Sequence, residues 1–123
     1  MALPHLRPVT QHIIGAYLAD VSTAGSAWVV SPWKGHISKV YSVLEAAITV
    51  GDATWTVEIG GAAVDGISVT IANSGSAAGT VDSGTPSTPS DSFVTEGQAI
   101  EFVNAAGSTG TVPVRFYAVI DRD

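Results

Sequence analysis

The stretch TWTVEIGGAAVDGISVTI, residues 54–71, decides the fold class, because two alternating segments flank a glycine-rich interruption. Apolar residues occupy every second position on both sides of it: Trp55, Val57 and Ile59 before, and Ile67, Val69 and Ile71 after. Successive side chains of a strand point to opposite faces, so each segment predicts a half-buried strand. The pairs Gly60-Gly61 and Asp65-Gly66 lie between them, and they predict an antiparallel hairpin with a loop of several residues.

The same alternation recurs outside this hairpin. Residues 112–120 and 99–103 predict two further strands, whereas 11–18, 27–30 and 80–82 are weaker candidates. Pro113 has no N–H to donate to a neighbouring strand, so it predicts an edge position or a bulge. The apolar strand faces predict this core: Trp55, Val57, Ile59, Ile67, Val69, Ile71, Ile100, Phe102, Val114 and Phe116.

Residues 37–48 fit two periods. Positions 37, 40, 41, 44 and 48 match a helical stripe, and positions 40, 44, 46, 48 and 50 match one face of a strand. The β-branched and aromatic residues favour a strand, whereas residues 44–47 favour a helix. Both interpretations remain open, with the strand preferred.

Residues 73–94, NSGSAAGTVDSGTPSTPSDSFV, contain mostly small and turn-forming residues. A linker here would leave only about 30 residues after it, too few to bury a core alone. A phosphate-binding loop would need a Gly-Lys-Ser/Thr sequence before a helix, and the stretch has no Lys. It therefore predicts a surface connection within one all-β domain: a single antiparallel β-sandwich or jelly roll of seven or eight strands, residues 11–123.

Residues 1–10 predict an extended N-terminal arm. Leu3, Leu6 and Val9 recur every third residue, which places them on one edge of a polyproline II helix. Burying three such side chains gains roughly 4–8 kcal/mol, whereas ordering ten residues costs about 10–20 kcal/mol. We therefore expect these three side chains to bind a partner only in an assembly, with the arm flexible in the isolated protein.

Composition excludes several function classes. The chain of 123 residues carries five Lys and Arg against eleven Asp and Glu, a net charge of −6, and no basic cluster. This argues against nucleic acid and anionic membranes as partners. Cysteine is absent, so thiolate metal sites and disulfides are excluded. The N-terminus has no apolar core of a secretion signal, so we do not expect a secreted protein.

No pattern predicts catalysis, and we expect neither an enzyme nor a cofactor. The histidines are not spaced as metal ligands, and the carboxylates are scattered singly. Trp55 belongs to the predicted core, but Trp28 and Trp33 are candidates for a partner contact, where aromatic residues are enriched. The same two residues leave a carbohydrate-binding module open, and a fibre-type structural domain is a further alternative.

Three runs carry a resemblance to a known family: GHISKVYSVLEAAITVGDATWTVEIGGAAVDGISVTIANSGSAAGTV, VTEGQAIEFVNAAGST and VRFYAVID, within residues 35–121. Together they resemble the head decoration, or cement, proteins of tailed bacteriophages, which have a jelly-roll-like β-sandwich. The resemblance implies a homotrimer that is made in the host cytoplasm and joins the outer surface of the virion. There it binds the major capsid protein and stabilises contacts between copies of that protein. It implies no catalytic residues, and it leaves the first 30 or so residues uncovered.

Overall fold

The computed structural model describes residues 10–123, which form one all-β domain of two antiparallel sheets packed as a sandwich. The predicted fold class is therefore confirmed. One short 3-10 helix, η1 (Pro89–Ser92), interrupts the strands, and this part of the chain contains no α-helix. Except for Thr10, the predicted arm lies outside the described residues.

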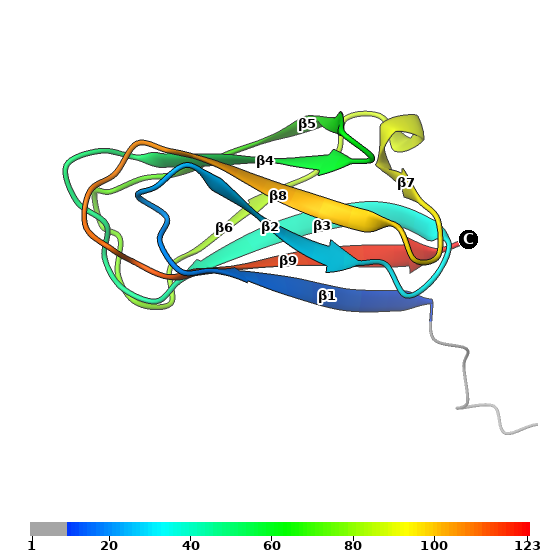
Figure 1. Cartoon of the computed structure of the whole chain (residues 1–123), viewed down its shortest axis with the longest axis horizontal. Coiled ribbons are helices and arrows are strands. Elements are labelled where there is room, and N and C mark those ends of the chain that lie inside the picture. Colours follow the sequence, from blue (N-terminus) through cyan, green and yellow to red (C-terminus); the bar gives the residue numbers. More distant parts are fainter. Residues whose placement is uncertain (1–9) are drawn as a thin grey trace, which may run out of the picture.

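Nine strands make up the two sheets (Figure 1). The five-stranded sheet has the order β1-β9-β3-β6, with β7 also pairing with β3. Its strands are β1 (Gln11–Leu18), β3 (Gly35–Leu44), β6 (Val81–Gly84), β7 (Phe93–Val94) and β9 (Val114–Arg122). The four-stranded sheet has the order β2-β8-β4-β5. Its strands are β2 (Gly25–Val30), β4 (Ala53–Ile59), β5 (Ala62–Ile71) and β8 (Ala99–Ala106).

The strand pairs follow the path of a folded ribbon. β4 pairs with β5, β3 with β6 and β7, β2 with β8, and β1 with β9, and successive pairs alternate between the sheets. This nesting is the jelly-roll arrangement. Figure 1 shows that the described chain begins and ends at one end of the sandwich, whereas the β1–β2, β3–β4, β5–β6 and β8–β9 connections lie at the other.

The β4–β5 hairpin is tighter than the sequence predicted. Only Gly60 and Gly61 connect the strands, both at positive φ (60° and 82°), as a two-residue hairpin turn requires. Asp65-Gly66 lies inside β5 instead of a loop, where the register with β4 shifts. Gly66 has φ of 86°, and a Cβ there would lie 1.9 Å from the hydroxyl oxygen of Ser87. The glycine therefore lets the segment after β6 lie against the edge of β5.

The ambiguous residues 37–44 form strand β3, and a bulge explains why a helical stripe fitted them. The register with β9 shifts between Ile37 and Lys39, so Ile37 and Val40 both face the core although they lie three positions apart. Leu44 continues the buried face and ends the strand. Positions 46 and 50 on the expected strand face are exposed because the strand has ended.

The expectation for Pro113 was wrong. The last strand begins one residue later, at Val114, and β9 lies between β1 and β3 at the centre of its sheet. Pro113 therefore needs no N–H for pairing, while its carbonyl accepts a hydrogen bond from the Glu45 N–H at 3.1 Å. Val112, which precedes it, is buried.

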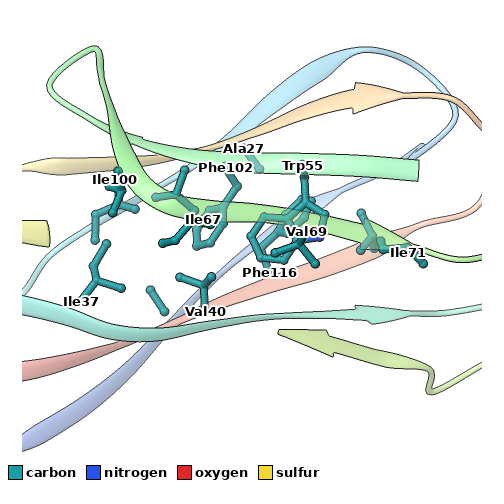
Figure 2. Packing of buried hydrophobic residues seen from close by; sticks show 14 of the residues in the cluster. Ala27, Ile37, Val40, Trp55, Ile67, Val69, Ile71, Ile100, Phe102 and Phe116 are labelled. Atoms are coloured by element: carbon teal, nitrogen blue, oxygen red, sulfur yellow. The ribbon is translucent and has the colours of Figure 1, made fainter. Parts of the chain in front are cut away.

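All ten predicted core residues are buried. Figure 2 shows Trp55, Phe102 and Phe116 among the residues that pack between the sheets. At the centre the rings of Phe102 and Phe116 stack with centroids 5.1 Å apart, and Trp55 meets Phe116 edge-on at 5.0 Å. The indole N–H of Trp55 donates to the Ser42 hydroxyl at 3.1 Å, so this buried donor is satisfied. The aromatic cluster therefore joins β4 and β8 of one sheet to β9 of the other.

Candidate assembly surfaces

Residues 10–123 contain no cluster of three or more His, Asp or Glu side chains that could hold a metal ion. His12 lies edge-on to Trp33, with ring centroids 5.2 Å apart. His36 lies 3.6 Å from Asp121 and 3.4 Å from Asp123, a surface contact between β3 and the end of the chain. These contacts connect structural elements of the fold.

Two shallow grooves mark the five-stranded sheet and its margin. One, of about 270 Å³, lies beside Gly15, Tyr17 and Tyr117, and another, of about 170 Å³, lies between β3 and the segment before β7. Both are smaller than the roughly 300–1,000 Å³ of typical small-molecule sites. The described residues also include no helix long and apolar enough to cross a bilayer. The outer faces of the two sheets are therefore the surfaces to consider.

The outer face of the five-stranded sheet carries three tyrosines and two cations, which we call the tyrosine face: Tyr17, Lys39, Tyr41, Arg115 and Tyr117. Tyr41 lies directly opposite Tyr117 across β3 and β9, and Tyr17 lies opposite Arg115 across β1 and β9. Each cation lies over a tyrosine ring at 5.4 Å, Lys39 over Tyr41 and Arg115 over Tyr17. These contacts hold the cations flat on the sheet.

Gly15 has a specific role beneath this face. It lies opposite Tyr117, and a Cβ at Gly15 would be 2.9 Å from the Tyr117 ring. The absence of a side chain at Gly15 therefore lets the Tyr117 ring lie across the edge strand β1. The ring covers the backbone that Gly15 would otherwise leave exposed. Ile13, on the same face of β1, is 65% exposed. The face thus presents apolar and aromatic surface up to its edge.

The outer face of the four-stranded sheet differs in charge, and we call Trp28, Glu58 and Glu101 the acidic face. Glu101 on β8 lies directly between Trp28 on β2 and Glu58 on β4. The Ser26 hydroxyl donates to the Glu101 carboxylate at 2.6 Å. Trp28 is 61% exposed, so a large apolar side chain adjoins the two carboxylates.

At the loop end away from the chain termini, Val50 combines exposure with backbone strain. Its side chain is 82% exposed, and its φ of 70° is unusual for a β-branched residue. Hydrogen bonds between Thr49 and Thr109 fix the loop from one side. Backbone strain of this kind persists only where the neighbouring structure enforces it. In this loop the strained backbone holds the apolar Val50 side chain in solvent.

Two aspartates have shifted pKa values, for opposite reasons. The Ser22 hydroxyl and N–H donate to Asp20 at 2.6 and 2.9 Å in the β1–β2 turn and lower its pKa. Burial raises the pKa of Asp82, because one carboxylate oxygen is enclosed without a hydrogen-bond partner among the described residues. Asp82 belongs to the edge strand β6, and neither group lies in a catalytic arrangement.

The structure places the residues that the sequence singled out in different surroundings. Trp28 projects from β2 on the acidic face, whereas Trp33 is half-buried against the core, with the Arg122 guanidinium 5.3 Å over its ring. Leu3, Leu6 and Val9 lie outside the described residues. The tyrosine face was not predicted from the sequence, although Tyr17 lies between half-buried neighbours on β1 and Tyr117 between buried neighbours on β9. The alternation along each strand places the tyrosine on the face opposite the core, and this spacing could have identified the tyrosine face.

No protein-family model and no curated protein matches the sequence. One similar solved structure is a chain of the "Cyanophage Pam1 capsid asymmetric unit". The match has a TM-score of 0.53 and 15% sequence identity, and it covers 100% of this chain and 93% of the other. At this identity the likeness shows a shared fold, and it extends over both chains almost completely.

Proposed function

We propose that this chain is a structural protein of a bacteriophage virion, namely a decoration or cement protein of the head. In this role it binds the outer surface of the capsid as a homotrimer and stabilises contacts between major capsid proteins. The observation that carries the proposal is the fold likeness to a chain of a cyanophage capsid unit over the whole length. The sequence resemblance to decoration proteins supports the same role independently. Because one fold hosts many functions, the surfaces must also fit.

The outer faces support assembly rather than catalysis. Large apolar side chains are exposed on both sheets, Ile13 and Tyr17 on one and Trp28 and Val30 on the other. Charged residues make up only 13% of the chain, so few charges have to be desolvated when these faces are covered. Exposed apolar surface of this kind is typical of protein contacts.

The proposed partners are other copies of this chain and a major capsid protein. Trp28, exposed on the acidic face, supplies one contact, and Trp33, half-buried at the end of the sandwich, supports another. In the N-terminal arm, Leu3, Leu6 and Val9 supply a third contact. Nucleic acid and membranes are not proposed as partners, because the four cations of residues 10–123 form no basic patch.

Sedimentation tests the proposal in two steps. Analytical ultracentrifugation of the full chain at micromolar concentration should give the mass of a trimer. The protein should then pellet with expanded capsids assembled from the major capsid protein encoded with it. A variant lacking residues 1–10 should bind those capsids more weakly. A chain that stays in the supernatant at saturating capsid concentration would refute the capsid role.

A carbohydrate-binding module is the second candidate, and exposed Trp28 is the observation that favours it. A sugar-stacking platform usually needs more than one accessible ring, whereas Trp33 is half-buried and Trp55 is fully buried. Binding to a glycan array, lost in Trp28→Ala, would support this alternative in place of the capsid role.

A further inference from the structure

A groove between two tyrosine rings lies at the edge strand β1 of the five-stranded sheet, and we call it the tyrosine groove. Its lining residues are Gly15, Ala16, Tyr17, Arg115 and Tyr117. The groove is open and shallow, with a volume of about 270 Å³. A small-molecule site encloses most of its ligand. A shallow groove at a sheet edge is better suited to an extended chain that lies along it.

The lining combines apolar ring surface with hydrogen-bond donors. Tyr17 is 51% exposed, and Tyr117 is half-buried beside it. The Arg115 guanidinium lies over the Tyr17 ring at 5.4 Å, and its Nε donates to Glu45 at 3.1 Å. The tyrosine hydroxyls and the other N–H groups of Arg115 are further donors. Aromatic grooves of this kind bind segments in the polyproline II conformation, whose carbonyls have no partner within the segment.

The N-terminal arm has the sequence pattern that such a groove requires. Leu3, Leu6 and Val9 recur at the three-residue period of a polyproline II helix, and Pro4 and Pro8 fix φ close to its value. The two prolines also lack an N–H, which makes the arm a poor additional strand for the free edge of β1. The arm therefore matches the groove as a polyproline II segment.

Charge favours the same pairing. All eleven Asp and Glu residues of the chain lie within residues 10–123, whereas residues 1–9 contain Arg7 and no acidic residue. The sandwich is therefore acidic and the arm is cationic, so they attract each other. Because Glu45 already offsets the charge of Arg115, the groove presents no unpaired cation that would repel Arg7.

The direction of β1 favours the groove of another copy. The Thr10 carbonyl accepts a hydrogen bond from the Arg122 N–H at 2.7 Å, so Thr10 continues the line of β1. Figure 1 shows this strand beginning at the end of the sandwich where the chain also finishes, and Tyr17 lies near the other end of the strand. An arm bound to its own groove would have to reverse direction at Val9 and Thr10, and β-branched residues favour extended backbone.

We propose that the tyrosine groove of each copy binds the N-terminal arm of a neighbouring copy, with the edge formed by Leu3, Leu6 and Val9 against the rings of Tyr17 and Tyr117. This contact rests on the self-association in the proposed function, and it names the segment and the surface that produce it. Each copy donates one arm and accepts another, so three such contacts form a closed ring when the rotation closes. The sandwiches do not have to stack through their sheet faces.

NMR with a free peptide tests the groove. The isotope-labelled full chain carries Leu3→Asp and Leu6→Asp, which remove the apolar edge of its own arm and leave the groove free. A synthetic peptide with the parent sequence of the arm is added up to millimolar concentration. The amide signals of Gly15, Tyr17 and Tyr117 should shift and then saturate. The same variant without peptide should self-associate at least about tenfold more weakly than the parent in sedimentation velocity.

Matched variants of the labelled chain and of the peptide test the chemistry of the contact. Tyr17→Ala should weaken peptide binding about tenfold or more. Val81→Ala is the control, because Val81 is 56% exposed in the same cross-strand row, on β6 at the opposite edge of the sheet. It lies about 14 Å from the groove and should leave binding unchanged. A peptide with Pro4→Ala and Pro8→Ala should bind several-fold more weakly, because it is no longer preorganised. Tighter binding of that peptide would contradict the polyproline II geometry and indicate strand addition to β1.

A spin label shows which copy supplies the arm. The chain has no cysteine, so Ala2→Cys gives a single attachment point beside the apolar edge of the arm. Spin-labelled copies without the isotope are mixed with isotope-labelled parent copies that have no spin label. The amide signals of Tyr17 and Tyr117 in the labelled copies should broaden, because a neighbour supplies the arm.

Two outcomes would overturn the proposal. In one, a millimolar excess of peptide leaves the groove signals unchanged. In the other, broadening occurs only when the spin label and the isotope are in the same chain, which would mean that the arm binds its own groove. Capsid pelleting tests the proposed function separately. Copies that exchange arms but ignore capsids refute the capsid role alone, whereas capsid-bound copies whose arms leave the neighbouring grooves empty refute the arm contact alone.

Discussion

Replacing Phe116 by alanine removes a ring from the centre of the sandwich. The side chain is fully buried, stacks on Phe102 with centroids 5.1 Å apart, and meets Trp55 at 5.0 Å. A buried Phe→Ala substitution costs about 3–5 kcal/mol, because transfer free energy is lost and a cavity remains. The lost ring contacts, about 0.5–1.5 kcal/mol each, place the expected value in the upper half of that range. Domains of this kind are stable by about 5–15 kcal/mol, so the loss is a large fraction.

Urea unfolding followed by tryptophan fluorescence measures this loss, and Phe93→Ala is the matched control. Phe93 is 51% exposed, and its ring contact with His36 spans 5.9 Å at the surface. Its replacement should cost less than about 1 kcal/mol. The midpoint should fall strongly for Phe116→Ala with an unchanged slope. A loss below about 1 kcal/mol at Phe116, or equal losses at both positions, would refute the assigned packing of the sheets.

Three further changes test individual features of the fold. Asp82→Asn should stabilise the protein at pH 7, because burial raises the pKa of Asp82 from its ordinary 3.8. The folded state then favours the protonated carboxyl, so the penalty vanishes below pH 3.8 and grows as pH rises through the folded pKa; urea midpoints that differ equally at low and neutral pH would contradict this. Asn104→Ala should cost about 1–3 kcal/mol, since its buried amide donates to two carbonyls of the β1–β2 connection at 2.9 and 2.8 Å. Hydrogen exchange should rise in that connection, and unchanged exchange would argue against the bond. Gly66→Ala should lower the melting temperature more than Gly61→Ala, because both have positive φ but only Gly66 has Ser87 in the space of a Cβ; equal shifts would contradict the close approach.

Alternation along the chain predicted most of the strands, and it predicted the buried faces of β4, β5, β8 and β9. Trp55 and Phe116 are examples, because their position within a strand pattern fixes the face on which they lie. The period was misleading where a bulge added a residue, as between Ile37 and Lys39. A bulge depends on the pairing of β3 with β9, and that pairing is not encoded in either strand alone.

The candidate surfaces could not be predicted from single strands, because they depend on which residues of neighbouring strands lie opposite each other. Sequence placed Glu58 and Glu101 in separate strands, and only the pairing of β4 with β8 brings them opposite each other. Trp28 was singled out from composition, whereas its place beside Glu101 follows from the β2–β8 register. Surface positions are weakly constrained by local pattern, since many residue types are compatible with an exposed strand face. The cluster of Trp28, Glu58 and Glu101 is therefore a product of the folded arrangement.

The capsid role is the central claim, and cryo-electron microscopy of expanded capsids incubated with the purified chain tests it most directly. Capsids from the same assembly without the chain serve as the control. The account predicts additional density on the outer surface, at regular lattice positions, into which trimers of the jelly roll fit. Capsid maps that are identical with and without saturating protein would contradict the account.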